Sequence, residues 1–370
     1  MPLLRCLALL FAASAAPLSF PDVQLLEEKG ETSAGVSLGD LNGDGRMDLM
    51  LAKGRHWPLH NRVLLNNGQG GYTASNLGAQ PDRTYSAALA DIDRDGDLDV
   101  VVSNDAPDRK LIYKNDGKAR FTEAGTFGEP GWTTRYVTLG DLNGDGYPDI
   151  VAANRGGGPK PVASFVCFND RRGGFPACQA VPSESATSIA VRDLDGDGAA
   201  DLFVPHRDGG QSAVLWNDGQ GRFASTTKVG PEKAVARISA VGDLDGDQRP
   251  DLVYIDEAKR AAFVMYARGK RAFSEAQALP GNAHTPYALA LGDLNRDGRL
   301  DIVVGLVKAP GVVYFNDGTG RNFQQVPWND GAGVVYGMVF GDVNGDKVTD
   351  IIAARSDAPN AVWFGKPAKP

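Results

Sequence analysis

The chain has 370 residues, of which 42% are hydrophobic and 23% charged, enough for one large globular domain or two ordinary ones. Its 46 glycines and 46 acidic residues, spread among many short apolar runs, are typical of a turn-rich all-β protein. The formal net charge of −8 argues against a nucleic-acid-binding protein.

The N-terminus has the pattern of a secretory signal peptide over residues 1–15. Arg5 precedes an apolar run from Cys6 to Ala13, and Ala13-Ser14-Ala15 offers a small-x-small cleavage site. A buried first helix is the alternative, although the run is short. Cys6 lacks a lipoprotein context, so we expect no lipid anchor, and no later segment is long and apolar enough to span a bilayer. We therefore expect a secreted, periplasmic or cell-surface protein.

The first predicted strand is Ser19 to Leu26, with the sequence SFPDVQLL. It resembles GFPACQAV (Gly174 to Val181) and RFASTTKV (Arg222 to Val229). Each of those segments ends a repeat unit that recurs along the chain.

The repeat is marked by a nine-residue acidic motif that occurs seven times. The copies are DLNGDGRMD from Asp40, DIDRDGDLD from Asp91, DLNGDGYPD from Asp141, DLDGDGAAD from Asp193, DLDGDQRPD from Asp243, DLNRDGRLD from Asp293 and DVNGDKVTD from Asp342. Their starts are 51, 50, 52, 50, 50 and 49 residues apart. A period of this length indicates one supersecondary unit per repeat.

Each unit reads as four strands. A short stretch such as YSAALA (Tyr85 to Ala90) precedes the motif, and an apolar run such as DIVVG from Asp301 follows it. A third strand then ends in an Asn/Asp-Gly turn, which suits a tight hairpin, and a fourth follows. Four strands per unit of about 50 residues is the period of a propeller blade. We predict an all-β, seven-bladed propeller of four-stranded antiparallel blades over residues 16–370.

The last unit stops after its third strand, Ala361 to Phe364. The fourth strand that it lacks is present at the other terminus, as Ser19 to Leu26. We therefore predict that the N-terminal strand completes the last blade and leaves no open edge in the ring.

The acidic motif suits calcium, a hard cation that takes six to eight oxygen ligands. In the first copy Asp40, Asn42, Asp44 and Asp48 would supply side-chain oxygens, and Arg46 its backbone carbonyl. The helix–loop–helix calcium site closes with a glutamate at position twelve, whereas this motif closes with an aspartate at position nine.

These features resemble the FG-GAP/VCBS-repeat propellers, to which the integrin α-subunit head is related. The resemblance covers essentially the whole chain after the signal and implies up to seven calcium ions. It is specific for the fold and not for a ligand. The predicted metal ligands are Asp40, Asn42, Asp44, Arg46 and Asp48; Asp91, Asp93, Asp95, Asp97 and Asp99; Asp141, Asn143, Asp145, Tyr147 and Asp149; Asp193, Asp195, Asp197, Ala199 and Asp201; Asp243, Asp245, Asp247, Arg249 and Asp251; Asp293, Asn295, Asp297, Arg299 and Asp301; and Asp342, Asn344, Asp346, Val348 and Asp350.

Two copies replace the turn glycine, by Gln248 and Lys347, and need either a strained residue or a different turn. Lys347 also adds a positive charge, so the seventh site is predicted to be the weakest. The ions are expected to be structural, because each ligand set is satisfied within one loop.

Two cysteines remain after cleavage of the signal. Cys167 and Cys178 flank the turn of one hairpin, and an exported protein with one pair favours a disulfide between them. Two buried thiols are the alternative.

The face opposite the acidic loops is expected to carry basic and aromatic side chains, because the remaining connections emerge there. Such a surface suits an acidic glycan or protein loop, and a solvated rim is the alternative. The candidate ligand-binding residues are Arg55, His56, Trp57, His60, Arg83, Tyr85, Trp132, Arg135, Tyr136, His206, Arg237, His284, Tyr287 and Tyr336.

Two local motifs carry little weight as catalytic or zinc signatures. GRHWPLHNR (Gly54 to Arg62) holds two histidines, but zinc would need further ligands, so we expect a ligand-contacting loop. GVSLG (Gly35 to Gly39) matches the hydrolase nucleophile pattern, but it lies on a predicted inner strand and lacks the strand–turn–helix context.

The absence of a catalytic signature favours a monomeric, calcium-stabilised binding protein for a glycan or an extracellular protein. The alternative is a polysaccharide-acting enzyme of the lyase or dehydratase type on the same scaffold.

Overall fold

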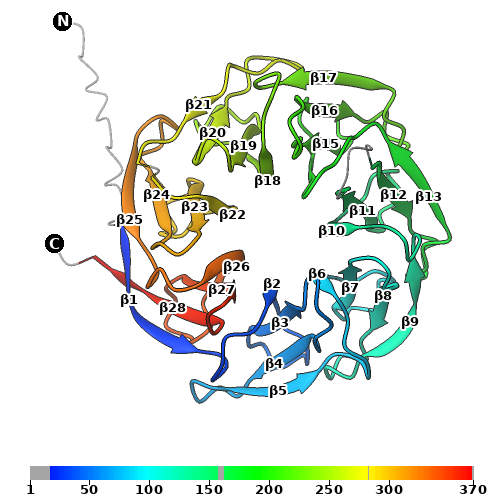
Figure 1. The fold of residues 1–370 in the computed structure, drawn as a ribbon, viewed down its shortest axis with the longest axis vertical. Coiled ribbons are helices and arrows are strands. Elements are labelled where there is room, and N and C mark those ends of the chain that lie inside the picture. Colours follow the sequence, from blue (N-terminus) through cyan, green and yellow to red (C-terminus); the bar gives the residue numbers. More distant parts are fainter. Residues whose placement is uncertain (1–16, 157–161, 282, 369–370) are drawn as a thin grey trace, which may run out of the picture.

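The computed structural model describes residues 17–156, 162–281 and 283–368. These residues form 28 strands in seven four-stranded antiparallel sheets, arranged as blades around a central axis (Figure 1). This confirms the predicted all-β, seven-bladed propeller. Within the same residues no helix is long and apolar enough to cross a membrane. The predicted signal peptide lies outside the described residues.

The blades follow one another in chain order, each running from an inner strand to an outer one. Blade 1 contains β2 (Ser33–Gly39), β3 (Asp48–Lys53), β4 (Arg62–Asn66) and β5 (Tyr72–Asn76); blade 2 contains β6 (Thr84–Ala90), β7 (Asp99–Asn104), β8 (Lys110–Lys114) and β9 (Thr122–Phe127). Blade 3 contains β10 (Thr134–Gly140), β11 (Asp149–Asn154), β12 (Ser164–Phe168) and β13 (Ala177–Val181); blade 4 contains β14 (Ala190–Arg192), β15 (Asp201–Val204), β16 (Ser212–Trp216) and β17 (Ser225–Val229). Blade 5 contains β18 (Ala236–Gly242), β19 (Asp251–Asp256), β20 (Ala261–Met265) and β21 (Gln277–Ala278); blade 6 contains β22 (Pro286–Gly292), β23 (Asp301–Leu306), β24 (Val312–Asn316) and β25 (Phe323–Pro327). Blade 7 contains β26 (Val334–Gly341), β27 (Asp350–Ser356), β28 (Ala361–Pro367) and, as its outer strand, β1 (Leu18–Leu25).

The N-terminal strand closes the ring as predicted. β1 pairs antiparallel with β28, with Val23 opposite Trp363 and Leu25 opposite Ala361. The two strands lie side by side in Figure 1, where the first strand meets the last. This pairing completes the four-stranded sheet of blade 7 and covers the edge of β28.

The hydrophobic core lies between neighbouring blades. In one cluster Met50 and Val63 of blade 1 pack with Val100 and Leu111 of blade 2, and all four side chains are buried. The second strand of every blade is buried along its whole length. The apolar runs after each motif therefore face neighbouring blades on both sides, which explains why they do not alternate with polar residues.

Antiparallel pairing sorts the connections onto two faces. The acidic loops join strands one and two of each blade, so all seven lie on one face, called here the loop face, together with the turns between strands three and four. The connections between strands two and three, and those between blades, lie on the opposite face.

Asparagine side chains fasten five of the blades to the acidic loop of the preceding blade. In blade 2, the Asn115 amide donates to the carbonyl of Leu41, the second residue of the first loop, at 2.8 Å. The same bond recurs elsewhere at 2.7–2.8 Å; the other donors are Asn66, Asn169, Asn217 and Asn316. Blade 5 has Ala267 at this position, and blade 7 has Gly365.

The predicted disulfide is present. Cys167 on β12 lies directly opposite Cys178 on β13, and the two sulfur atoms are bonded at 2.02 Å.

Candidate functional site

Each acidic loop is wound around its first aspartate. In the first loop, Asp40 Oδ1 accepts from the Gly43 N–H and Oδ2 accepts from the Gly45 N–H, both at 2.8 Å. The bond from the sixth residue recurs in all seven loops; its donors are Gly45, Gly96, Gly146, Gly198, Gln248, Gly298 and Lys347. The seven loops therefore share one turn.

That turn requires a positive φ at the sixth residue, including where glycine is replaced. Gln248 and Lys347 both adopt φ 66°. The prediction allowed a strained residue or a different turn, and the structure shows the first. The fourth residue is also left-handed, so Arg94 and Arg296 are strained in the same way, which the sequence analysis did not single out.

The ninth residue of each loop is a buried aspartate that also anchors the third strand. Asp48 is fully buried; its Oδ2 accepts from the Leu41 N–H at 2.9 Å and its Oδ1 accepts from the Asn66 N–H at 2.8 Å. A carboxylate has about four acceptor positions, so these bonds leave lone pairs free for a cation.

Burial raises the pKa of these closing aspartates. The pKa of Asp301 rises to about 7, and that of Asp99, Asp149, Asp201, Asp251 and Asp350 to about 6. Backbone N–H donors oppose the effect, whereas the other loop carboxylates reinforce it. A bound cation would favour the ionised form and reverse this shift.

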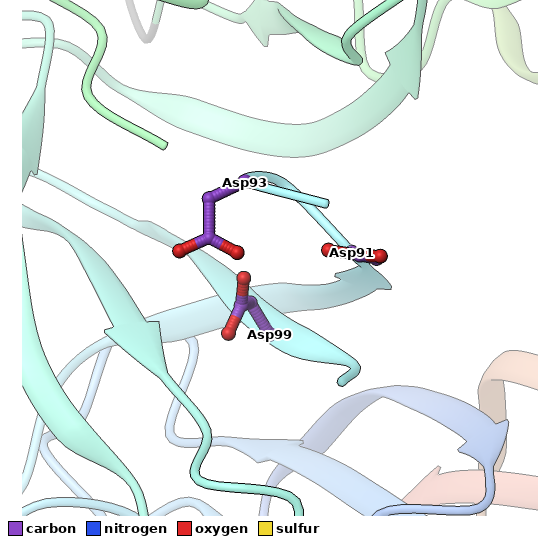
Figure 2. Close-up of side chains that lie close together, drawn as sticks. All are labelled: Asp91, Asp93 and Asp99. Carbon is purple, nitrogen blue, oxygen red and sulfur yellow. The ribbon is translucent and has the colours of Figure 1, made fainter. Parts of the chain in front are cut away.

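In three loops at least three carboxylates converge so that their oxygen atoms lie within 4.8 Å of one another. The trios are Asp91, Asp93 and Asp99; Asp193, Asp195 and Asp197; and Asp243, Asp245 and Asp251. Figure 2 shows the carboxylates of the first trio gathered at one loop. This all-oxygen donor set fits a hard cation, and these clusters could hold a metal ion.

These three loops are also the ones with aspartate at the third position. Each such aspartate faces a basic side chain: Asp93 lies 2.6 Å from Lys114 Nζ, Asp195 lies 2.5 Å from Arg271 Nε, and Asp245 lies 3.8 Å from Arg321 Nη2. The other four loops have asparagine there. The third-position carboxylate of each of these loops is therefore paired with a positive charge, which the repeated motif alone did not predict.

On the opposite face, one register position of the inner strands surrounds the axis. This position lies six residues before the first aspartate of each loop. From blade 1 to blade 7 it holds Ala34, Tyr85, Arg135, Thr187, Arg237, Tyr287 and Tyr336. All but Thr187, which precedes β14, lie within an inner strand.

Five of these seven residues are arginine or tyrosine; together with Arg55 we call those five the axial ring. The Arg135 guanidinium lies 4.4 Å from the centre of the Tyr85 ring, and the Arg237 guanidinium lies 3.9 Å from that of Tyr287. Arg55, from the β3–β4 connection, completes the series where the inner strand has only Ala34. Its guanidinium lies 3.9 Å from the Tyr336 ring and 5.9 Å from that of Tyr85.

Acidic residues that the sequence analysis missed pair with these arginines. Asp105 Oδ1 lies 2.7 Å from Arg135 Nη1, although without the alignment of a hydrogen bond. Glu257 forms ion pairs with both Arg207 and Arg237. The face is thus less basic than predicted, because these acids lie in unrepeated loop segments that carry no motif.

A hydrogen-bonded chain links Asp105, His56 and Tyr85 at one side of the axial ring. His56 Nε2 lies 2.8 Å from Tyr85 Oη, and His56 Nδ1 lies 3.1 Å from Asp105 Oδ2. Burial and the nearby Arg135 guanidinium hold the pKa of His56 below its usual value. Neutral His56 would donate from Nδ1 to Asp105 and accept the Tyr85 proton at Nε2.

The other predicted ligand residues make their contacts away from the axial ring or are exposed. Arg83 pairs with Asp108 at 2.8 Å, and Trp132 stacks on Phe165 with ring centres 4.0 Å apart. His206 Nδ1 accepts from the Gly210 N–H at 2.9 Å. Four predicted residues remain: Trp57 (68% exposed), Tyr136 (41% exposed), His284, which is exposed, and His60, whose buried Nδ1 has no hydrogen-bond partner among the described residues.

A cavity of about 560 Å³ lies on the axis, lined by inner strands and including Tyr136. Ser37 of the GVSLG segment also lines it. The Ser37 hydroxyl donates to the Ala87 carbonyl at 2.6 Å and so joins two neighbouring inner strands. The segment therefore forms part of strand β2, as predicted, and does not form a nucleophile elbow.

A family profile described as FG-GAP-like repeat matches residues 40–102, 91–152, 193–254 and 243–304, together more than half of the chain. The chain belongs to the FG-GAP-like repeat family. This confirms the resemblance to the FG-GAP/VCBS-repeat propellers.

Among curated proteins, the chain is similar to cartilage acidic protein 1. It is 32% identical to the Xenopus tropicalis protein over 163 residues, which are 40% of this chain and 25% of that protein. It is 27% identical to the Mus musculus protein over 187 residues, 46% of this chain and 28% of that protein. The match thus spans about a quarter of the length of these relatives.

Solved structures show the same fold at low identity. BBS1N in complex with ARL6DN, soaked with mercury, superposes with a TM-score of 0.61 at 15% identity, covering 95% of this chain and 97% of that one. A catalytically inactive virginiamycin B lyase from Staphylococcus aureus with quinupristin superposes with a TM-score of 0.59 at 13% identity, covering 94% and 99%.

Proposed function

We propose that the protein is a secreted, calcium-stabilised recognition propeller that binds a glycan or an extracellular protein on the face opposite the acidic loops. The observation that carries this proposal is the axial ring, in which arginines and tyrosines from six blades meet at the mouth of the axis. Residues far apart in the sequence thus form one surface.

The chemistry of the axial ring suits an acidic partner. An arginine stacked on a tyrosine face is held in one orientation, so less side-chain entropy is lost when it binds. Its guanidinium edge offers paired donors for a carboxylate or a sulfate. Neighbouring tyrosines offer flat apolar surfaces of the kind that recognition sites use.

The loop face would hold up to seven calcium ions as structural elements, with the seventh site the weakest. The all-oxygen clusters support this part of the proposal, and the ions would offset repulsion among the carboxylates. The disulfide supports an oxidising compartment, as does similarity to proteins named for cartilage. We expect a monomer with no nucleic-acid partner.

A glycan and matrix-protein array tests the recognition function. We expect saturable binding of an acidic ligand by the calcium-loaded protein and its loss in Tyr336→Ala. Arg120→Met, which removes an exposed arginine from the loop face, is the matched control and should bind normally. Binding that Tyr336→Ala leaves unchanged would refute the assignment to the axial ring.

A second function, catalysis on a bound polysaccharide, is favoured by the Asp105–His56–Tyr85 chain. An aspartate that orients a histidine which in turn accepts a hydroxyl proton is a general-base arrangement. Every array hit should therefore be incubated with the protein and analysed for new products. Turnover that Tyr85→Phe abolishes, with binding retained, would make the protein an enzyme of the lyase or dehydratase type.

A further inference from the structure

The axial ring is interrupted at the fourth blade. Thr187 occupies the register position that holds Arg135 in blade 3 and Arg237 in blade 5. Blade 1 also lacks an arginine or tyrosine at this position, where it has Ala34, but there Arg55 lies against the rings of Tyr336 and Tyr85. At blade 4 the arginine of the corresponding connection, Arg207, forms an ion pair with Glu257 instead.

Unpartnered buried donors gather in this sector of the ring. Nε of Arg155, Arg207 and Arg237, and the Thr187 hydroxyl, have no hydrogen-bond partner among the described residues. Arg207 and Arg237 are each only 8% exposed. Buried donors are nearly always satisfied in folded proteins, so four in one sector indicate a missing acceptor.

The charge balance of the sector is also incomplete. Three guanidinium groups, those of Arg155, Arg207 and Arg237, face two carboxylates. Asp208 pairs with Arg155 at 3.2 Å, and Glu257 pairs with the other two. Burial lowers the pKa of Arg207, and the neighbouring arginines lower it further. Among the described residues, these three guanidinium groups therefore carry one more positive charge than the two carboxylates that pair with them.

We propose that the blade 4 gap is an anion-binding subsite, formed by Arg155, Thr187, Arg207 and Arg237, that takes one singly charged oxyanion group. A carboxylate or a sulfate ester on the ligand would supply both the missing acceptor and the missing charge. This inference rests on the proposed function, since it names the ligand group that the axial ring recognises.

Small anions test the subsite directly. The melting temperature of the calcium-loaded protein is followed during titration with sodium acetate or sodium methyl sulfate, against sodium chloride at equal ionic strength. We expect a saturable rise with at least one of the two oxyanions, because an anion that binds only the folded state stabilises it. The preferred anion identifies the ligand group.

Two variants locate the effect. Arg155→Met should weaken the apparent affinity roughly tenfold or more, since a charge-assisted hydrogen bond is lost. Thr187→Tyr should block the gap without removing a charge. Arg109→Met is the matched control, because Arg109 is likewise a surface arginine with one carboxylate partner, Glu123.

The subsite is overturned if neither oxyanion acts beyond chloride, or if Arg155→Met responds as the unchanged protein does. Its failure is distinguishable from that of the proposed function. If Thr187→Tyr still binds the array ligand normally, the subsite is refuted and the recognition function stands. If small anions raise the melting temperature but no array ligand binds, the subsite is supported and the recognition function is refuted.

Discussion

Val23, near the start of the described chain, lies directly opposite Trp363, near its end. Trp363 is almost fully buried and belongs to the core cluster between blades 6 and 7. Leu18 and Phe20 of the N-terminal strand belong to the same cluster. The two ends of the chain therefore share a hydrogen-bonded sheet and a hydrophobic core.

Deleting Ser19 to Leu26 should abolish cooperative unfolding. The deletion removes the outer strand of blade 7, and burial of each large apolar side chain contributes about 1.5–3 kcal/mol. The measurement is a thermal melt followed by circular dichroism. A chain lacking only residues 2–16 serves as the control, and an unchanged melt of the longer deletion would refute closure by this strand.

Replacing Asn115 by alanine should lower the free energy of unfolding by about 1–3 kcal/mol, because its amide then no longer donates to the carbonyls of Leu41 and Leu98. Urea denaturation measures the change. Asn67→Ala is the control, because Asn67 lies in an exposed turn and caps only local N–H groups. If the two substitutions lowered the free energy of unfolding equally, the hydrogen bond between the blades would not stabilise the fold more than a local turn does.

Calcium should raise the melting temperature at pH 7.5, and this gain should shrink as the pH falls from about 7 to 5. In the ion-free protein, burial raises the pKa of Asp99, Asp149, Asp201, Asp251 and Asp350 to about 6, and that of Asp301 to about 7. The folded state then binds more protons than the unfolded one above the ordinary value of 3.8. Its stability therefore rises as the pH falls through this window.

Calcium needs the ionised carboxylates, so protons compete with it over the same range. Calorimetry of dialysed protein with and without calcium chloride, from pH 5 to pH 8, measures both effects. A melting temperature that calcium leaves unmoved at pH 7.5 would contradict bound calcium.

Lys114→Met should increase the stabilisation by calcium while lowering the stability of the ion-free protein by up to about 1 kcal/mol. Without Lys114, the Asp93 carboxylate loses the cation 2.6 Å away, and the second loop becomes more negative. The difference in melting temperature with and without calcium measures this. Lys118→Met, in an exposed turn of the same blade, should leave the difference as it is.

The blade count, strand order and ring closure could be predicted because they depend on repetition. Seven motifs at a near-constant period identify the units, and each apolar run after a motif identifies a buried second strand. The shared loop geometry was also accessible, since backbone bonds to the first aspartate involve neighbours in the chain. Two of the three cations beside the third-position aspartates, Arg271 and Arg321, could not be predicted, because they come from the following blade.

The axial ring shows the same division. The sequence alone determined which face would carry arginines and tyrosines, because antiparallel pairing sends alternate connections to alternate ends of a blade. Only the tertiary structure decided that Arg55 stacks on Tyr336 beside Ala34, that Asp105 joins His56 and Tyr85, and that Glu257 pairs with both Arg207 and Arg237. These contacts join different blades, so they depend on how the blades pack around one axis, which local sequence patterns do not encode.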